Sequence, residues 1–372
     1  MGRGGGTRGQ VPCPILYFSQ KVSTGQGTCP RVPPPRPISF PVFLFRGGWC
    51  ILFFNRATRG REAFFLGIVV FGAVFVDIKG YPLAQYIPGG RNVGRVLQVH
   101  GGVSRNVAED IANVELCPTF ISVVDESGIS TDVIEKLKAH KVNTSYIRRT
   151  EDGLGTWLAI FDNQGDVAAA ISKRPDLSEI GSILEEHGDE IIRNADSIVV
   201  EIDMEPSILK QIFDLAEKYH KEVFAVVSNM SIALERRDLL QKTGCVVCNE
   251  QEAGLLFSEE YESFSPEELL TIIRSNAQQA KIPRMVITLG DLGSVYTELN
   301  GESGFCPPIS VNVVDTTGAG DAFFAGVAIG LTYGKTLAES CSIGTRLASS
   351  TIATKENVCP RFLPEEFGIT VK

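Results

Sequence analysis

The chain has 372 residues, enough for one large domain with a substantial core, or for one domain and a smaller appendage. Its 44% hydrophobic and 21% charged residues are ordinary for a globular protein. The net charge of −9 argues against a nucleic-acid-binding protein, which would carry a basic stripe, and the best apolar run, residues 63–76, is too short to span a bilayer.

The first 64 residues differ in composition from the rest. They contain eight arginines and one lysine against a single acid, Glu62, whereas the remainder carries 26 basic and 43 acidic residues. Four prolines lie between Pro33 and Pro37, which excludes a helix or a central strand there. We therefore predict that residues 1–64 form a leader that is disordered or not part of the fold, and that residues 65–372 form the folded domain.

The nine cysteines are odd in number and scattered, with no disulfide framework. This pattern favours a reducing compartment, and we expect a cytoplasmic protein; the arginine-rich leader leaves organellar targeting open. Cys245 and Cys248 form a C-x-x-C pair without a second pair or a nearby histidine. We interpret this pair as a buried strand end rather than a metal or redox site.

From residue 66 onward, strand-like and helix-like segments alternate. Helical spacing of apolar residues predicts helices over 103–114 and 129–140. Short apolar runs predict strands over 67–77, 119–124, 156–161, 167–171, 197–201, 222–227, 245–248 and 285–289. The alternation predicts an α/β fold with a doubly wound, mostly parallel sheet covered on both faces. Functional residues are then expected just after strands, because ligands bind beyond the carboxyl ends of such sheets.

The strongest chemical signal is the segment 313–326, V-V-D-T-T-G-A-G-D-A-F-F-A-G. An apolar strand end meets a glycine-rich turn, and a helix is predicted to begin near Ala319. The N–H groups of its first turn can face a ligand and stabilise the charge of a transferred phosphoryl group. Asp321 is placed there to accept the proton of an attacking hydroxyl. The alternative is a capping turn in which Asp321 is a favourable first-turn acid.

The sequence D-T-T-G-A-G-D-A-F resembles the carboxyl-terminal signature of the ribokinase-like carbohydrate kinases, the PfkB family, and the similarity covers about residues 66–369. The resemblance implies an ATP-dependent kinase with Asp321 as catalytic base and an anion hole formed by Gly318, Ala319 and Gly320. It also marks Asp315 and Thr317 as candidates for a monovalent-cation site that would take K⁺.

The same resemblance implies a ribokinase-like architecture with a small β-sheet lid. The lid would come from segments near 79–100 and 155–172, would close over a small-molecule substrate and would exclude water. In this family such lids often form the contact of a homodimer.

Further segments resemble other motifs of the family. Two glycines before a predicted helix and an acid at the end of the first predicted strand imply a substrate site made of Asp77, Gly101, Gly102, Arg105 and Asn106. Segments after two later strands imply nucleotide contacts from Asn249, Thr288, Gly290 and Gly293, with Glu252 holding Mg²⁺ through water. Taken alone, these segments are also compatible with ordinary turns and helix caps.

The substrate is indicated by two short stretches. G-G-V-S-R-N-V-A at 101–108 and P-G-G-R-N-V at 88–93 resemble the pseudouridine kinases, although Arg91 stands where that subgroup has Ser and Val93 where it has Pro. The implied reaction is the conversion of pseudouridine to pseudouridine 5′-phosphate, with Arg105 as a substrate-side or structural residue. The alternatives are a kinase for ribose, fructose or adenosine, and a catalytically silent sugar-binding regulator on the same fold.

Residues 330–336, G-L-T-Y-G-K-T, superficially resemble a phosphate-binding P-loop. One residue is missing between the glycines, and a P-loop must follow a strand, whereas this segment follows a predicted helix. We interpret Gly334 as a helix stop and Thr336 as the cap of the next helix.

Overall fold

The computed structural model describes residues 67–227, 230–261 and 264–370. The predicted leader, residues 1–64, lies outside these ranges, so its boundary with the folded domain stays a prediction. Among the helices of the described residues, none is both long enough and apolar enough to cross a membrane.

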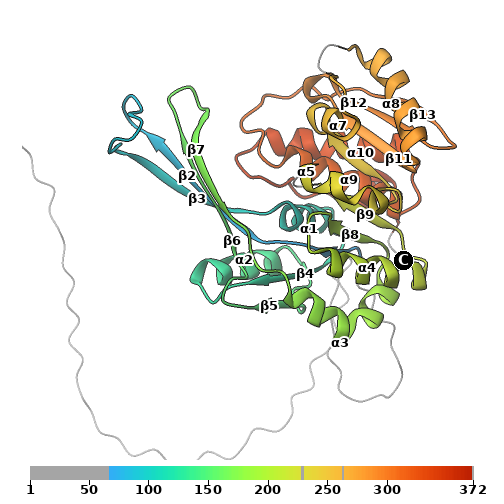
Figure 1. Ribbon diagram of the computed structural model, residues 1–372, viewed down its shortest axis with the longest axis horizontal. Helices are drawn as coiled ribbons and strands as arrows, with labels where there is room; N and C mark the ends of the chain where they lie inside the picture. Colours follow the sequence, from blue (N-terminus) through green and yellow to red (C-terminus); the bar gives the residue numbers. More distant parts are fainter. Residues whose placement is uncertain (1–66, 228–229, 262–263, 371–372) are drawn as a thin grey trace, which may run out of the picture. The chain divides into compact units, whose positions relative to one another are not determined.

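A large sheet forms the centre of the described domain. Its strands are β1 (Val69–Phe71), β4 (Thr119–Val124), β5 (Ile147–Arg149), β8 (Ile198–Glu201), β9 (Val223–Val226), β10 (Val246–Asn249), β11 (Arg284–Thr288), β12 (Ser294–Glu298) and β13 (Ser303–Cys306). Their order is β13-β12-β11-β10-β9-β8-β1-β4-β5. Neighbouring strands from β5 to β11 run parallel, and β12 and β13 add an antiparallel edge (Figure 1). The predicted mostly parallel sheet is therefore confirmed.

Helices cover both faces of this sheet. Residues of β1 alternate between two buried clusters: Val69 and Phe71 belong to one, and Val70 to the other. The first cluster contains residues of α3 (Glu179–Asn194), α4 (Pro206–Tyr219), α7 (Glu250–Phe257) and α8 (Pro266–Ala280). The second contains residues of α1 (Val103–Asn113), α2 (Gly128–Ala139), α9 (Ala319–Thr332) and α10 (Leu337–Ile352). Shorter elements are α5 (Met230–Ala233), α6 (Arg237–Leu240), η1 (Leu234–Arg236), η2 (Gly290–Leu292) and η3 (Pro364–Phe367).

A second sheet of four strands, here called the lid sheet, contains β2 (Phe75–Pro82), β3 (Gly94–Gly101), β6 (Gly155–Phe161) and β7 (Val167–Lys173). Their order is β3-β2-β6-β7, with β2 and β6 parallel and the other pairs antiparallel, and Figure 1 shows the four strands side by side. The segments predicted to form a small lid near 79–100 and 155–172 do form this smaller sheet.

The single strand predicted over 67–77 is wrong, because the chain leaves the large sheet after Phe71 and enters the lid sheet at Phe75. A Cβ on Gly72 would lie 2.1 Å from Ser104 Oγ, so the chain passes too close to α1 for any larger residue. The next N–H group, of Ala73, donates to the Glu201 carboxylate at 2.9 Å instead of continuing the ladder.

Two other local predictions can be compared with the structure. Cys245, directly before β10, packs in one buried cluster and Cys248 of β10 packs in the other, so the two side chains lie on opposite faces of the sheet. Gly334 follows α9 with a φ of 78°, and the Thr336 side chain accepts from the N–H of Glu339 as the cap of α10. The helix-stop interpretation of this segment is confirmed.

Candidate active site

The glycine-rich turn precedes the N-terminus of α9. Gly318 has a φ of 83°, and a Cβ there would lie 2.0 Å from the main-chain oxygen of Asn357, so only glycine fits. Ala319 begins the helix, and a Cβ on Gly320 would meet no atom within 4 Å. The first-turn N–H groups of a helix have no acceptor within it, so open space beside Gly320 suits an anion.

Asp321 lies in this first turn and is half-buried. Its Oδ2 accepts a hydrogen bond of 2.6 Å from Nδ2 of Asn106, which comes from α1. Burial raises the pKa of Asp321 to about 6, with Asp77 adding to the rise and with Asn106 and Arg105 opposing it. A carboxylate with this pKa is ionised at neutral pH and still basic enough to take a proton from a hydroxyl.

Asp77 approaches the same site from β2. A Cβ on Gly101 would lie 2.7 Å from Asp77 Oδ1, and one on Gly102, whose φ is 97°, would lie 2.7 Å from the main-chain oxygen of Ala73. Burial raises the pKa of Asp77, while Lys79 and Arg105 oppose the rise. The structure thus brings the predicted substrate-side residues to the predicted base, across more than 200 positions of sequence.

Arg105 is the exception among the predicted substrate residues, because its side chain is only 1% exposed. Its Nη1 donates to Glu109 Oε2 at 2.6 Å, its Nε donates to the oxygen of Gly101 at 3.2 Å, and its Nη2 donates to the oxygen of His100. The guanidinium therefore holds the turn between β3 and α1, which favours the structural alternative over direct substrate contact.

One face of the lid sheet is aromatic, a feature that the sequence analysis missed. Trp157 of β6 is the register partner of Asp77 and so lies on the same face. Tyr81 stacks on Phe161 with 4.8 Å between ring centroids, and Phe161 lies edge-on to Trp157 at 6.3 Å. Alternation along β2 could have placed Tyr81 on the same face as Asp77, but nothing local could have given the register of Trp157.

Lys79 also lies on this face of β2, two positions after Asp77. Although burial raises the pKa of Asp315, the N–H of Thr317 and the charge of Lys79 hold it below its usual value. Lys79 is therefore within electrostatic reach of the turn that leads to α9.

Glu201 is a second residue that the sequence analysis missed. Its Oε2 accepts from the N–H of Ala73 at 2.9 Å and from Ser104 Oγ at 3.0 Å, so it joins the break between β1 and β2 to the start of α1. It also lines a cavity of about 150 Å³ beside the carboxyl end of β8. The available signal was an acid at the end of a predicted strand.

Asn249 and Glu252 form a capping box at the start of α7. Oδ1 of Asn249 accepts from the N–H of Glu252 at 2.8 Å, and Oε2 of Glu252 accepts from the N–H of Asn249 at 2.9 Å. Burial raises the pKa of Glu252, opposed by this N–H group. A carboxylate oxygen can accept more than one hydrogen bond, so Glu252 can cap the helix and still bind a metal-bound water. Carboxylate and amide oxygens are ligands that suit Mg²⁺.

The predicted nucleotide segment 288–293 forms the turn of the β11–β12 hairpin. Thr288 is the register partner of Asn249, so both predicted nucleotide segments meet at the carboxyl ends of neighbouring strands. Gly290 has a φ of 59° with open space around its Cβ position, whereas a Cβ on Gly293 would lie 2.3 Å from the oxygen of Cys306. Gly293 is thus required by the hairpin, and Gly290 leaves room for a ligand.

The predicted cation residues lie in the turn before α9. Oδ1 of Asp315 accepts from the N–H of Thr317 at 2.9 Å and closes the turn. A K⁺ site at these residues stays a prediction.

A larger cavity, of about 520 Å³, lies elsewhere in the described residues. It is lined by the amino ends of β9 and β11 and the carboxyl end of antiparallel β12, including Val223, Arg284 and Glu298. It opens at the edge of the sheet opposite Asn249 and Thr288, and none of the predicted site residues lines it.

Comparisons with known proteins agree with this geometry. A family model described as pfkB family carbohydrate kinase matches residues 66–360. The chain is 32% identical over 292 residues to a guanosine-inosine kinase of Exiguobacterium acetylicum, covering 78% of this chain and 95% of the relative. It is 27% identical over 278 residues to a pseudouridine kinase of Escherichia coli, covering 73% and 86%. Among solved structures, an Arabidopsis thaliana ribokinase complexed with ribose and ATP superposes with a TM-score of 0.70 at 21% identity, covering 82% of this chain and 99% of that one.

Proposed function

The chain belongs to the pfkB family of carbohydrate kinases, and we propose that within it the protein transfers the terminal phosphate of ATP to the 5′-hydroxyl of a nucleoside. The observation that carries the proposal is the pairing of Asp321 with Asn106 at the N-terminus of α9, near Asp77, whose face of the lid sheet presents aromatic rings. A silent sugar-binding regulator would not need a carboxylate whose pKa is about 6 at that position.

The aromatic rings support a nucleoside in preference to a free sugar. Trp157, Phe161 and Tyr81 lie on the same face of the lid sheet as Asp77. A carboxylate such as Asp77 can accept hydrogen bonds from ribose hydroxyls, while a nucleobase offers a flat surface for an aromatic ring. Ribose and fructose present no such surface.

The chemical step follows from the residues of the α9 turn. The substrate hydroxyl attacks the terminal phosphorus of ATP while Asp321 takes the hydroxyl proton and Asn106 holds the carboxylate in place. The bond from that phosphorus to the bridging oxygen breaks, and ADP leaves. The N–H groups beside Gly318 and Gly320 stabilise the charge on the transferring phosphoryl oxygens. Closure of the lid sheet would keep water from competing with the substrate hydroxyl.

ATP use is supported by the kinase family and by the ATP complex of the plant ribokinase. We place the nucleotide near Asn249, Thr288 and Gly290, at the carboxyl ends of β10 and β11. Glu252 would hold Mg²⁺ through water, and this ion supplies charge neutralisation of the phosphates when bound.

Two nucleoside classes compete as substrates. The guanosine-inosine kinase of Exiguobacterium acetylicum, with 32% identity over nearly its whole length, favours guanosine and inosine. The G-G-V-S-R-N-V-A segment and the 27% identity to the Escherichia coli enzyme favour pseudouridine. We rank the purine nucleosides first, because the first similarity is higher and covers more of the relative.

We also propose a homodimer that forms through the lid sheet, in the cytoplasm. Its support is a group of exposed apolar side chains on the lid face opposite Asp77, namely Val96, Leu158, Ile160 and Ile171.

The proposed cytoplasmic location is supported by five buried cysteines that are present as thiols, as expected in a reducing compartment: Cys245, Cys248, Cys306, Cys341 and Cys359.

The proposal is tested by ADP release from Mg²⁺-ATP with guanosine, inosine, pseudouridine, adenosine, ribose and fructose as acceptors. We expect turnover with guanosine and inosine, and a loss of at least about a thousandfold in Asp321→Asn, because the base is removed. Preference for pseudouridine would reverse our ranking. Preference for ribose or fructose would refute the nucleoside proposal while keeping the kinase mechanism.

A further inference from the structure

Asn357 lies between three parts of the site and has no role in the function proposed above. It follows α10, and its side chain is 6% exposed. Its Nδ2 donates to the main-chain oxygen of His100 at 2.8 Å and to Oδ1 of Asn106 at 3.2 Å. Its main-chain oxygen packs against Gly318, the glycine that precedes α9. One residue thus contacts the substrate turn, the partner of the base and the anion-binding turn.

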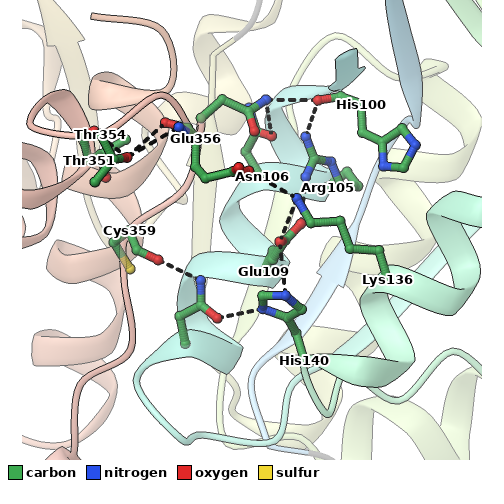
Figure 2. Close-up of polar contacts among 12 residues, drawn as sticks. His100, Arg105, Asn106, Glu109, Lys136, His140, Thr351, Thr354, Glu356 and Cys359 are labelled. Carbon is green, nitrogen blue, oxygen red and sulfur yellow. Dashed lines mark hydrogen bonds and ion pairs between the residues drawn. The ribbon is translucent and has the colours of Figure 1, made fainter. Parts of the chain in front are cut away.

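The segment that carries Asn357 is fixed to α1 and α2, as Figure 2 shows. The N–H of Cys359 donates to Asp110 Oδ1 at 2.6 Å, and Asn113 Nδ2 donates to the oxygen of Cys359 at 2.6 Å. Lys136 of α2 pairs with Glu356 at 3.5 Å. These contacts lie on both sides of Asn357, so they fix the position of the main chain from which its side chain extends.

The hydrogen bonds run from His100 through Asn357 and Asn106 to Asp321, and the groups at the two ends are acceptors that fix how the two amides are oriented. The main-chain oxygen of His100 only accepts, so the end of the Asn357 amide that faces it must be the NH₂ group. That group has two hydrogens, and the second meets Asn106, whose facing atom must then be the oxygen. The NH₂ group of Asn106 is thereby left facing Asp321, which is an acceptor when ionised.

We propose that Asn357 is a positioning residue for phosphoryl transfer: it fixes the orientation of the Asn106 amide, so that Asn106 donates to Asp321. The inference rests on the proposed function, since it takes Asp321 as the base. Without Asn357 the Asn106 amide could turn, and its oxygen would then face the carboxylate and repel it.

The electrostatic consequence has a definite sign. The charged groups near Asp321 are Arg105 and Asp110 of α1 and Asp77 of β2, and all three remain if Asn357 is changed. The hydrogen bond from Asn106 lowers the pKa of Asp321 against the effect of burial. Loss of that bond raises this pKa, so the base is protonated over a wider range of acid pH.

The test is the pH dependence of kcat/KM for the full-length Asn357→Leu variant, with ATP and the nucleoside that the wild type uses best. We expect the acid side of the profile to move up by about one pH unit, which is a loss of about tenfold at pH 5.5 and little loss at pH 8.5. A residue that only supports the fold would lower activity equally at both pH values.

Asn113→Leu is the matched control, because Asn113 is an equally buried amide that joins α1 to the same segment without touching Asn106 or Asp321. We expect it to lower the melting temperature and leave the pH profile unchanged. If Asn357→Leu does not fold, Asn357→Ser takes its place, since a serine hydroxyl cannot reach both acceptors, and the same shift is expected.

The inference is overturned if the acid side of the profile stays in place for the Asn357 variants, or moves equally in Asn113→Leu. Failure of the proposed function has a different signature. If Asp321→Asn keeps its turnover, Asp321 is not the base, and the role assigned to Asn357 falls with it.

Discussion

Burial of Asp321, the proposed base, should cost the protein stability as well as make the carboxylate more basic. The pKa of this carboxyl is about 6 in the fold and near 3.8 when unfolded, so the native state binds the proton more tightly. Its contribution to stability is therefore fully present below about pH 4, declines as the pH rises toward 6 and stays low at neutral pH. We expect Asp321→Asn to raise the free energy of unfolding at pH 7 by about 3 kcal/mol.

Urea unfolding of the wild type and Asp321→Asn at pH 7 and at about pH 4 measures this effect. The difference should shrink at the lower pH, where the wild-type carboxyl is neutral in the native state. An inactive variant no more stable than the wild type at pH 7 would show that the site accommodates the ionised carboxylate without penalty.

Residues in one contiguous motif could be predicted, and residues brought together by folding could not. Asp321 and its glycines stand within four positions of one another, so their turn and their chemistry are visible in the sequence. Asn357 lies 251 positions from Asn106, and Trp157 meets Asp77 only through strand register. No local pattern distinguishes either residue from an ordinary turn or core residue.

At the level of elements, the turn between β3 and α1 depends on a buried ion pair. Arg105 and Glu109 lie four residues apart on α1. Lys136 of α2 and His140, the C-cap of α2, approach the second oxygen of Glu109 at 3.2 and 3.7 Å (Figure 2). These charges hold the pKa of Glu109 below its usual value, although burial, the largest effect, raises it. The buried charges of Arg105 and Glu109 neutralise one another, so removing either residue leaves the other as an unpaired buried charge.

We expect Arg105→Met to lower the free energy of unfolding by about 3 kcal/mol, because Glu109 loses its main partner. The double variant Arg105→Met with Glu109→Met should recover about 2 kcal/mol of this loss, since the unpaired Glu109 carboxylate is then removed. Urea unfolding of both variants measures the recovery. A double variant no more stable than Arg105→Met would contradict the expectation.

Lys210→Met is the matched control, because Lys210 and Asp214 form a pair with the same spacing on the exposed face of α4, and it should cost less than about 0.5 kcal/mol. The nucleoside KM of the double variant decides the role of Arg105 left open by the sequence. A KM near that of the wild type indicates a structural residue, and a KM raised by tenfold or more indicates substrate contact.

Element boundaries were predictable where the hydrophobic period was uninterrupted, as in β4, which matches the predicted range 119–124. The prediction failed at Gly72, where the chain leaves one sheet for another. The end of β1 and the start of β2 are both apolar, so the hydrophobic pattern does not indicate that the chain moves from one sheet to the other. The cause is tertiary: Ser104 and Glu201 crowd the glycine, and Glu201 accepts the hydrogen bond of the next N–H group.

For the molecule as a whole, alternation of strands and helices was enough to predict the large sheet and its two covered faces, and the family resemblance supplied the lid. Neither could show how the two faces of the lid sheet differ. The face that carries Asp77 also carries Trp157, whereas the opposite face carries Ile171 and Val96, which are 69% and 67% exposed. A sheet face with several exposed apolar side chains is a candidate protein–protein surface.

We therefore expect the full-length protein to sediment as a dimer, and Ile171→Asp to sediment as a monomer, because a charge cannot be buried in such a contact without a partner. Leu363→Asp is the control: Leu363 is 57% exposed but lies outside the lid sheet, at the cap of η3, so its change should leave the dimer intact. Sedimentation velocity over a range of protein concentrations measures both.

If the lid sheet must be supported by a partner to close, the monomeric variant should also show a raised nucleoside KM. Its pH profile should be unchanged, since Asp321 and Asn106 lie outside the contact. A wild type that stays monomeric at micromolar concentration would instead mean that the exposed apolar face serves some contact other than self-association.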